Sequence, residues 1–293
     1  MVMLSRQCVG VIGVCIMSLL TSIANAVDVN KPQGLIVSSA FAGDLWFFGG
    51  ENGALYHGKK KNQDMRWQSL ALKNAGLVTD LEVIKRNSNT SKRRSKAALG
   101  YLFAATSKGR IIRTHFDIDH INDRWTTAYT PDSREPQPLF DIARITSRRL
   151  FAVGAFGTML ESLNMGETWR DVSASLDNPE TAHLYKIIPL PFAYRKKYNV
   201  HAVLLSEFGQ TYLLKQNPIT KKFKWMLKST GLDMTFFDGH YMADRWVLAF
   251  GVGGALVVLD LDSEKYYTSN LCVNESVFGV TADSTGRNLL LAL

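Results

Sequence analysis

The sequence predicts an all-β fold in which one strand–turn–strand unit recurs along the chain. Three observations favour it: apolar runs are separated by turns that contain glycine, these turns are nearly evenly spaced, and an aromatic residue follows most of them. Helical periodicity is nearly absent, because Gly and Ser interrupt most windows in which apolar residues could recur every three or four positions. Sheets that repeat in this way stack radially in a β-propeller.

Six segments share an apolar run, a turn closed by glycine and a second apolar run: residues 44–59, 101–114, 149–163, 200–215, 245–259 and 277–292. Their turn glycines are Gly53, Gly109, Gly157, Gly209, Gly254 and Gly286. Glycine is expected there because a short hairpin turn needs a residue at positive φ. The first four intervals fit a unit of about 40 to 50 residues, the length of one four-stranded blade. We therefore expect about six blades, within a range of five to seven.

A large aromatic residue follows each of the first five glycines by 12 to 16 positions: Trp67, Trp125, Trp169, Trp225 and Tyr266. We expect each ring at the start of an outer strand, where it covers the blade edge and fills the seam against the next blade. A stacked aromatic binding surface is the alternative, but regular recurrence favours a packing role.

The last repeat is incomplete, because an aromatic residue at the same spacing from Gly286 would lie beyond Leu293. Propellers often close by letting an N-terminal strand complete the last blade, and residues 34–40 are the expected closing strand. A truncated product and a ring completed by a partner are the alternatives.

Residues 1–26 have the features of a secretory signal peptide: Arg6, an apolar stretch over residues 9–20, and Ala24-Asn25-Ala26. An uncleaved N-terminal anchor is the alternative. Residues 27–293 are then the propeller domain, with the periplasm as the expected location. Removal of the signal peptide leaves Cys272 as the only cysteine, so no internal disulfide is expected.

The chain carries a formal net charge of +8, and much of its basic charge falls in runs at residues 59–61, 92–96, 195–197 and 221–224. Such runs are candidates for contact with nucleic acid or anionic lipid. They lie between strand-like segments, where solvated loops are expected, and export argues against nucleic acid. Contact with an anionic surface, a membrane face or an acidic partner is the second interpretation.

The third repeat contains the most specific motif, Ser162-Leu-Asn164-Met-Gly166-Glu-Thr168-Trp169. The Asn164 side chain is expected to bond the backbone of its own turn, with Gly166 in the strained conformation and the Trp169 ring over the hairpin. The motif resembles the Asp-box of neuraminidase-type repeats, with Asn164 at the family's Asp position. Residues 151–170 are also similar to the repeat of the photosystem II stability and assembly factor family. The matching positions are Gly154, Gly157, Leu160, Ser162, Gly166 and Trp169.

The resemblance implies a propeller that acts as a chaperone-like scaffold, with envelope-linked relatives in bacteria and no catalytic residues to carry over. We therefore predict a non-catalytic, exported protein without a cofactor that binds protein partners and assists a cell-envelope complex such as an exporter. The alternative is a neuraminidase-like propeller that binds or hydrolyses glycans. Such an enzyme needs an arginine cluster, a Tyr–Glu pair and an acid/base Asp. Its Arg-Ile-Pro signature is absent, and residues 27–65 contain no arginine.

One loop is rich in oxygen and imidazole ligands, with Asp117, Asp119 and His120 as candidates to hold a divalent ion. It lacks the Gly and distal Glu of an EF-hand loop, and a polar connecting loop is expected before Trp125. We therefore predict no metal site there.

Overall fold

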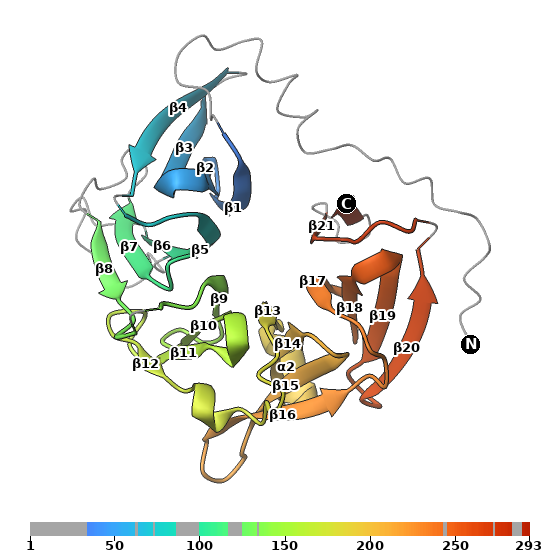
Figure 1. The fold of residues 1–293 in the computed structure, drawn as a ribbon. Helices are drawn as coiled ribbons and strands as arrows, with labels where there is room; N and C mark the ends of the chain where they lie inside the picture. Colours follow the sequence, from blue (N-terminus) through green and yellow to red (C-terminus); the bar gives the residue numbers. More distant parts are fainter. Residues whose placement is uncertain are drawn as a thin grey trace.

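The computed structural model describes residues 34–61, 64–72, 74–85, 100–116, 125–133, 135–242, 245–271, 273–282 and 289–293. Their strands form antiparallel sheets that stand around one axis (Figure 1). The predicted all-β propeller of about six blades is therefore confirmed. The predicted signal peptide, the candidate ion-binding loop, Cys272 and Gly286 lie outside the described residues.

The strands follow one another in chain order from the axis to the rim of each blade. The first blade consists of β1 (Ile36–Ala42), β2 (Leu45–Gly50), β3 (Ala54–Lys61) and β4 (Asp64–Ala71). The second consists of β5 (Val78–Lys85), β6 (Gly100–Thr106), β7 (Ile111–Phe116) and β8 (Thr126–Tyr129). The third consists of β9 (Leu139–Arg144), β10 (Leu150–Gly154), β11 (Met159–Ser162) and β12 (Arg170–Asp171).

The second half of the ring repeats this order. The fourth blade consists of β13 (Leu184–Pro189), β14 (Val200–Ser206), β15 (Gln210–Gln216) and β16 (Phe223–Ser229). The fifth consists of β17 (Phe236–Met242), β18 (Trp246–Gly251), β19 (Ala255–Asp260) and β20 (Lys265–Asn270). The last sheet has two described strands, β21 (Gly279–Ala282) and β22 (Leu289–Ala292). One short helix, α2 (Phe192–Tyr198), joins β13 to β14, and none of the described helices could span a membrane.

Antiparallel pairing within each blade gives the ring two distinct faces. The turns between second and third strands and the links between blades lie at one end, which we call the mouth face. The loops between first and second and between third and fourth strands lie at the other end, which we call the basic face. It includes residues 145–149, 163–169, 190–199 and 217–222.

The recurring aromatic rings pack into the seams between blades, but toward the preceding blade and not the next one. Trp225 lies with its ring 5.4 Å from that of Phe151 in the third blade. Trp169 joins a cluster with Ile84 and Phe103 of the second blade. Trp125 packs against a cluster shared with the first blade, and Tyr266 against one shared with the fourth. Trp67 packs against Phe48 and Tyr56 of its own blade. The predicted direction was therefore wrong.

The predicted closing strand also has a different place. β1 pairs with β2 and forms the innermost strand of the first blade, so residues 34–40 do not complete the last one. The hydroxyl of Ser38 donates to the carbonyl of Val78 in the second blade, 3.0 Å away, which fixes β1 against β5. The segment therefore begins the ring.

The described turn glycines all have positive φ: Gly53 (71°), Gly109 (67°), Gly157 (71°), Gly209 (62°) and Gly254 (69°). At Gly209, an added Cβ would lie 1.8 Å from the carbonyl oxygen of Leu232, in the link to the fifth blade. The amide of Gly209 also donates to the carbonyl of Met234. Glycine therefore allows the turn to pack directly on the backbone that leads to the next blade.

Gly209→Ala is expected to lower the free energy of unfolding by about 3 kcal/mol, because it adds a backbone clash to the strain of positive φ. Gly231→Ala is the matched control: Gly231 has a φ of 77°, but nothing lies within 4 Å of the added Cβ. The control should lose only about 1 kcal/mol. Chemical denaturation of both variants tests this, and equal losses would contradict the packing argument.

Candidate functional site

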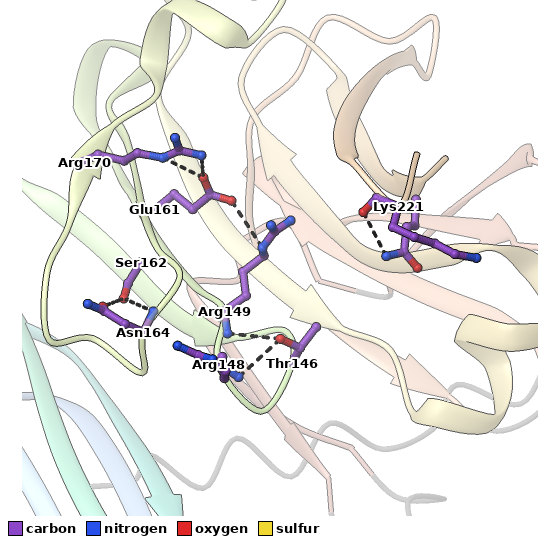
Figure 2. Close-up of polar contacts among 9 residues, drawn as sticks. Thr146, Arg148, Arg149, Glu161, Ser162, Asn164, Arg170 and Lys221 are labelled. Atoms are coloured by element: carbon purple, nitrogen blue, oxygen red, sulfur yellow. Dashed lines mark hydrogen bonds and ion pairs between the residues drawn. The ribbon is translucent and has the colours of Figure 1, made fainter. Parts of the chain in front are cut away.

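The predicted motif of the third repeat forms a closed hydrogen-bonded loop on the basic face (Figure 2). The Ser162 hydroxyl donates to Asn164 Oδ1 at 3.0 Å and accepts from the Gly166 amide at 2.8 Å. Asn164 Oδ1 also accepts from the Thr168 amide at 3.0 Å. An added Cβ on Gly166 would lie 2.3 Å from the Phe103 ring of the second blade. These contacts, with the bond from Asn164 Nδ2 to the Thr168 hydroxyl at 2.9 Å, engage the polar groups of Ser162, Asn164 and Thr168 in holding the loop, which is a structural role.

A different set of residues gathers where the mouth face opens into the central channel. In the complete blades, the register of the innermost strand shifts after its first residue. From the first blade to the fifth, the residues at the shift are Val37, Thr79, Phe140, Tyr185 and Phe237. Phe278 takes the corresponding place before β21. These residues, with Leu77, line a cavity of about 350 Å³. We call this cavity the aromatic mouth.

The rings of the aromatic mouth form one continuous surface. Phe140 stacks on Tyr185, with centroids 5.2 Å apart and planes at 7°. Tyr185 meets Phe237 edge-on at 5.2 Å, and Phe237 stacks on Phe278 at 4.9 Å. Aromatic residues prefer burial, so a series of rings around an open cavity is typical of a binding surface.

Polar groups fix one side of the aromatic mouth. The Tyr185 hydroxyl donates to Glu207 Oε1 at 3.2 Å, and the His183 amide donates to Glu207 Oε2 at 2.8 Å. Burial and, to a smaller extent, the Glu207 carboxylate raise the pKa of Tyr185 to about 12, so the phenol stays protonated. His183 Nδ1 accepts from the Phe156 amide at 3.0 Å, which leaves the proton of the neutral ring on Nε2.

Two phenylalanines extend the apolar surface outward and have strained backbones. Phe156 and Phe208 precede the turn glycines of the third and fourth blades, with φ of 52° and 55°. Their side chains are 60% and 46% exposed. Bulky residues avoid this left-handed region, and the same turn position holds Asn52 in the first blade and Gly253 in the fifth. Neither strain nor exposure stabilises the fold, so these two positions indicate a function.

Below the aromatic mouth, carboxylates of one blade bind backbone amides of the next. Asp80 accepts from the Ile142 amide at 3.0 Å, Asp141 from the Ile187 amide at 2.9 Å, and Asp238 from the Val280 amide at 2.8 Å. Lys186 occupies the corresponding position of the fourth blade, and its ammonium donates to Asp141 at 2.6 Å. We call these residues, together with Glu82, the carboxylate belt.

Burial between the innermost strands changes the protonation of the carboxylate belt. Burial raises the pKa of Asp80 well above its usual range, and it also raises that of Asp238. Burial raises the pKa of Glu82 from 4.5 to about 7, against the opposing effect of Arg144. Burial alone would lower the pKa of Lys186, but Asp141, Asp80 and Asp238 together raise it well above the usual value. Lys186 is therefore the cation that makes a buried group of acids tolerable.

Sequence reasoning missed the aromatic mouth. A signal was present, because Leu-Phe-Asp at 139–141, Leu-Tyr-Lys at 184–186 and Phe-Phe-Asp at 236–238 repeat an apolar–aromatic–charged triplet. The triplet lies outside the segments defined by the turn glycines and the tryptophans, so the repeat pattern did not single it out. The predicted repeat glycines of the other blades lie in turns of the mouth face and the predicted tryptophans in or beside the seams, and none of them lines the cavity. Among the described residues no cluster of three metal-ligating side chains is found.

Glu82→Gln is expected to make the protein more stable than the wild type at pH 8 but not at pH 4.5. Because the native pKa of Glu82 is raised to about 7, the native state keeps a proton that the unfolded chain loses above its usual pKa. The free energy of unfolding of the wild type therefore falls as pH rises toward 7. Glutamine does not titrate, so the variant keeps this free energy and should be about 2 kcal/mol more stable than the wild type at pH 8. Denaturation across this pH range measures it, with the exposed Glu135→Gln as control. A constant difference at all pH values would contradict the buried proton.

No family model matches the chain, and no curated protein sequence matches it. Solved structures do match. The WD40 β-propeller domain of Doa1 superposes with a TM-score of 0.59 at 11% identity, over 87% of this chain and 75% of that chain. YCF48 bound to D1 peptide superposes with a TM-score of 0.56 at 12% identity, over 85% and 72%.

The computationally designed Ika8 protein gives a TM-score of 0.57 at 10% identity, over 87% of this chain and 67% of that chain. At such identities the likeness shows the fold and not the activity. The chain is a β-propeller.

Proposed function

We propose that this β-propeller is a non-catalytic binding protein that holds an apolar segment of a protein partner at the aromatic mouth. The observation that carries the proposal is the pair Phe156 and Phe208, two exposed phenylalanines in strained turns beside a ring-lined cavity. Aromatic side chains offer large, rigid contact areas at low entropic cost, and they dominate the energetics of protein recognition.

The charge of the mouth face adds to the specificity. The turns and blade links around the aromatic mouth carry Glu51, Asp132, Glu135, Asp177, Glu180, Glu207, Asp233 and Glu275. Lys108 and Arg110 are their basic counterparts among the described residues of this face. Thr79 lines the cavity, and no hydrogen-bond partner for its buried hydroxyl is found in the described structure. An apolar segment flanked by basic residues fits these features.

Two further lines support a role in assembly. YCF48, one of the structural neighbours, is bound to D1 peptide in its structure. The repeat motif at Ser162–Trp169 resembles that of the photosystem II stability and assembly factor family. We propose that this chain is a distant, exported relative, that it serves a periplasmic or other envelope complex, and that its basic loops contact an anionic surface.

A glycosidase is the second candidate, because the mouth holds one element of neuraminidase chemistry. The Tyr185–Glu207 pair has the composition of the nucleophile pair of such enzymes. The described residues that line the cavity include no arginine or lysine, however, so none is placed to receive a substrate carboxylate. The raised pKa of Tyr185 also opposes formation of a nucleophilic phenolate. A fluorogenic sialoside assay separates the two functions, and robust turnover lost in Tyr185→Phe would favour the enzyme.

The double variant Phe156→Asn, Phe208→Asn is expected to lose partner binding while keeping or gaining stability. Asparagine tolerates the left-handed conformation, as Asn52 does at φ 55° in the first blade, so each substitution relieves strain of about 1 kcal/mol. A photo-cross-linker at Val252, an exposed turn residue of the mouth face, should capture envelope proteins in intact cells. Mass spectrometry should show that these adducts disappear in the double variant.

The same cross-linker at Met226, an exposed residue of the outer strand β16, is the control for position. It should give few of these adducts. Capture of no envelope protein above background at Val252, or equal capture in the double variant, would count against binding at the aromatic mouth.

A further inference from the structure

The basic face carries a second surface, far from the aromatic mouth along the axis, at the third and fourth blades. Every charged residue in its loops 145–149, 190–199 and 217–222 is basic: Arg148, Arg149, Arg195, Lys196, Lys197, Lys221 and Lys222. The adjoining loop 163–169 adds one exposed acid, Glu167. Figure 2 shows Arg148, Arg149 and Arg170 together on the third blade, with Lys221 on the neighbouring part of the fold. Glu161 is the buried acid between Arg149 and Arg170, at 3.3 and 2.5 Å. No ion pair is found for Arg148, Lys196, Lys221 or Lys222 among the described residues.

Two large apolar side chains project from this basic surface. Ile219, between β15 and β16, is 87% exposed, and Phe192, at the start of α2, is 80% exposed. They are the most exposed large hydrophobic residues in the described part of the chain. Isolated exposed apolar residues are ordinary, but here each one lies within a few positions of unpaired cations.

The fold holds both residues outward. Asn217 Oδ1 accepts from the amides of Ile219 and Thr220 at 2.9 and 2.8 Å, which closes a tight loop with Ile219 at its tip. Ile219 is therefore exposed at the tip of a turn that these hydrogen bonds hold in place.

Helix α2 is anchored by Tyr194 and Arg195. The Arg195 guanidinium donates to the carbonyls of Leu190 and Ile145, and the Tyr194 ring lies 5.2 Å from Tyr241 of the fifth blade. Phe192 and Lys196 are one helical turn apart on the exposed side. The contacts of Tyr194 and Arg195 thus hold the helix with one apolar and one cationic residue exposed to solvent.

We propose that the basic face binds an anionic lipid bilayer, with Phe192 and Ile219 inserted at the interface and the surrounding lysines and arginines on the headgroups. An apolar tip within a basic surface is the arrangement that peripheral proteins use, since neither insertion nor charge attraction alone gives stable binding. The acidic residues of the opposite face would be repelled by the same lipids, which fixes the orientation of the ring. The proposal rests on the proposed function only in assigning the basic loops to an anionic surface.

Vesicle co-sedimentation of the purified protein tests the proposal, with phosphatidylglycerol–phosphatidylethanolamine vesicles compared with neutral phosphatidylcholine vesicles. The wild type should bind the anionic vesicles, less tightly at high salt, and should not bind the neutral ones. The double variant Phe192→Ser, Ile219→Ser should lower the partition coefficient at least tenfold, and Lys221→Gln or Lys222→Gln should lower it about fivefold each. Because these side chains are exposed, the denaturation midpoints should stay unchanged.

The matched control exchanges exposed phenylalanines of the other face: Phe156→Asn, Phe208→Asn should keep full vesicle binding. This control separates failure of the lipid proposal from failure of partner binding at the aromatic mouth. A Phe192→Trp reporter should shift its fluorescence to shorter wavelength on anionic vesicles. Absence of vesicle binding, binding unchanged in the Phe192/Ile219 variant, or in-cell cross-links from position 219 to an acidic protein and not to the membrane fraction would overturn the proposal.

Discussion

The free inner edge of each blade is the constraint on which the ring depends. An innermost strand has one neighbour in its own sheet, so the amides that face the axis have no strand partner. Side-chain carboxylates of the preceding blade supply the missing acceptors, Asp80 for Ile142 and Asp141 for Ile187. These bonds join the blades in chain order and also crowd acids into the channel. The raised pKa values and the single Lys186 therefore follow from folding, and perturbed titration here is not evidence of catalysis.

Much of the fold could be predicted because its repeat depends on local geometry. A turn that packs on the backbone of the next blade link accepts only glycine, so Gly53, Gly209 and Gly254 mark the hairpins in the sequence. The aromatic spacing was equally visible, but a spacing does not tell which side of a sheet a ring covers. Trp225 therefore turned out to face the third blade, and the N-terminal strand could be placed on the wrong blade.

The candidate site could not be predicted in the same way, because it depends on a shift in strand register. Phe140, Tyr185 and Phe237 follow buried residues directly, and a run of consecutive apolar residues reads as core. Only the bulge after the first residue turns these rings from the seam to the axis. The innermost strands of five blades each place the residue at their register shift at the same end of the ring, and together these residues form a surface that no single repeat contains.

The two faces of the ring depart from folding rules in different ways, and this difference supports the different partners proposed for them. On the mouth face the violation is conformational: Phe156 and Phe208 occupy turn positions that asparagine or glycine would fill without strain. On the basic face the large apolar side chains of Phe192 and Ile219 are exposed to solvent, where folding alone would bury them. Rings around a cavity are suited to hold a segment of protein. Single exposed apolar residues on a basic surface are suited to insert at the interface of a lipid bilayer. With the basic face on lipid, the aromatic mouth opens away from the bilayer, and a partner segment reaches it from the aqueous side.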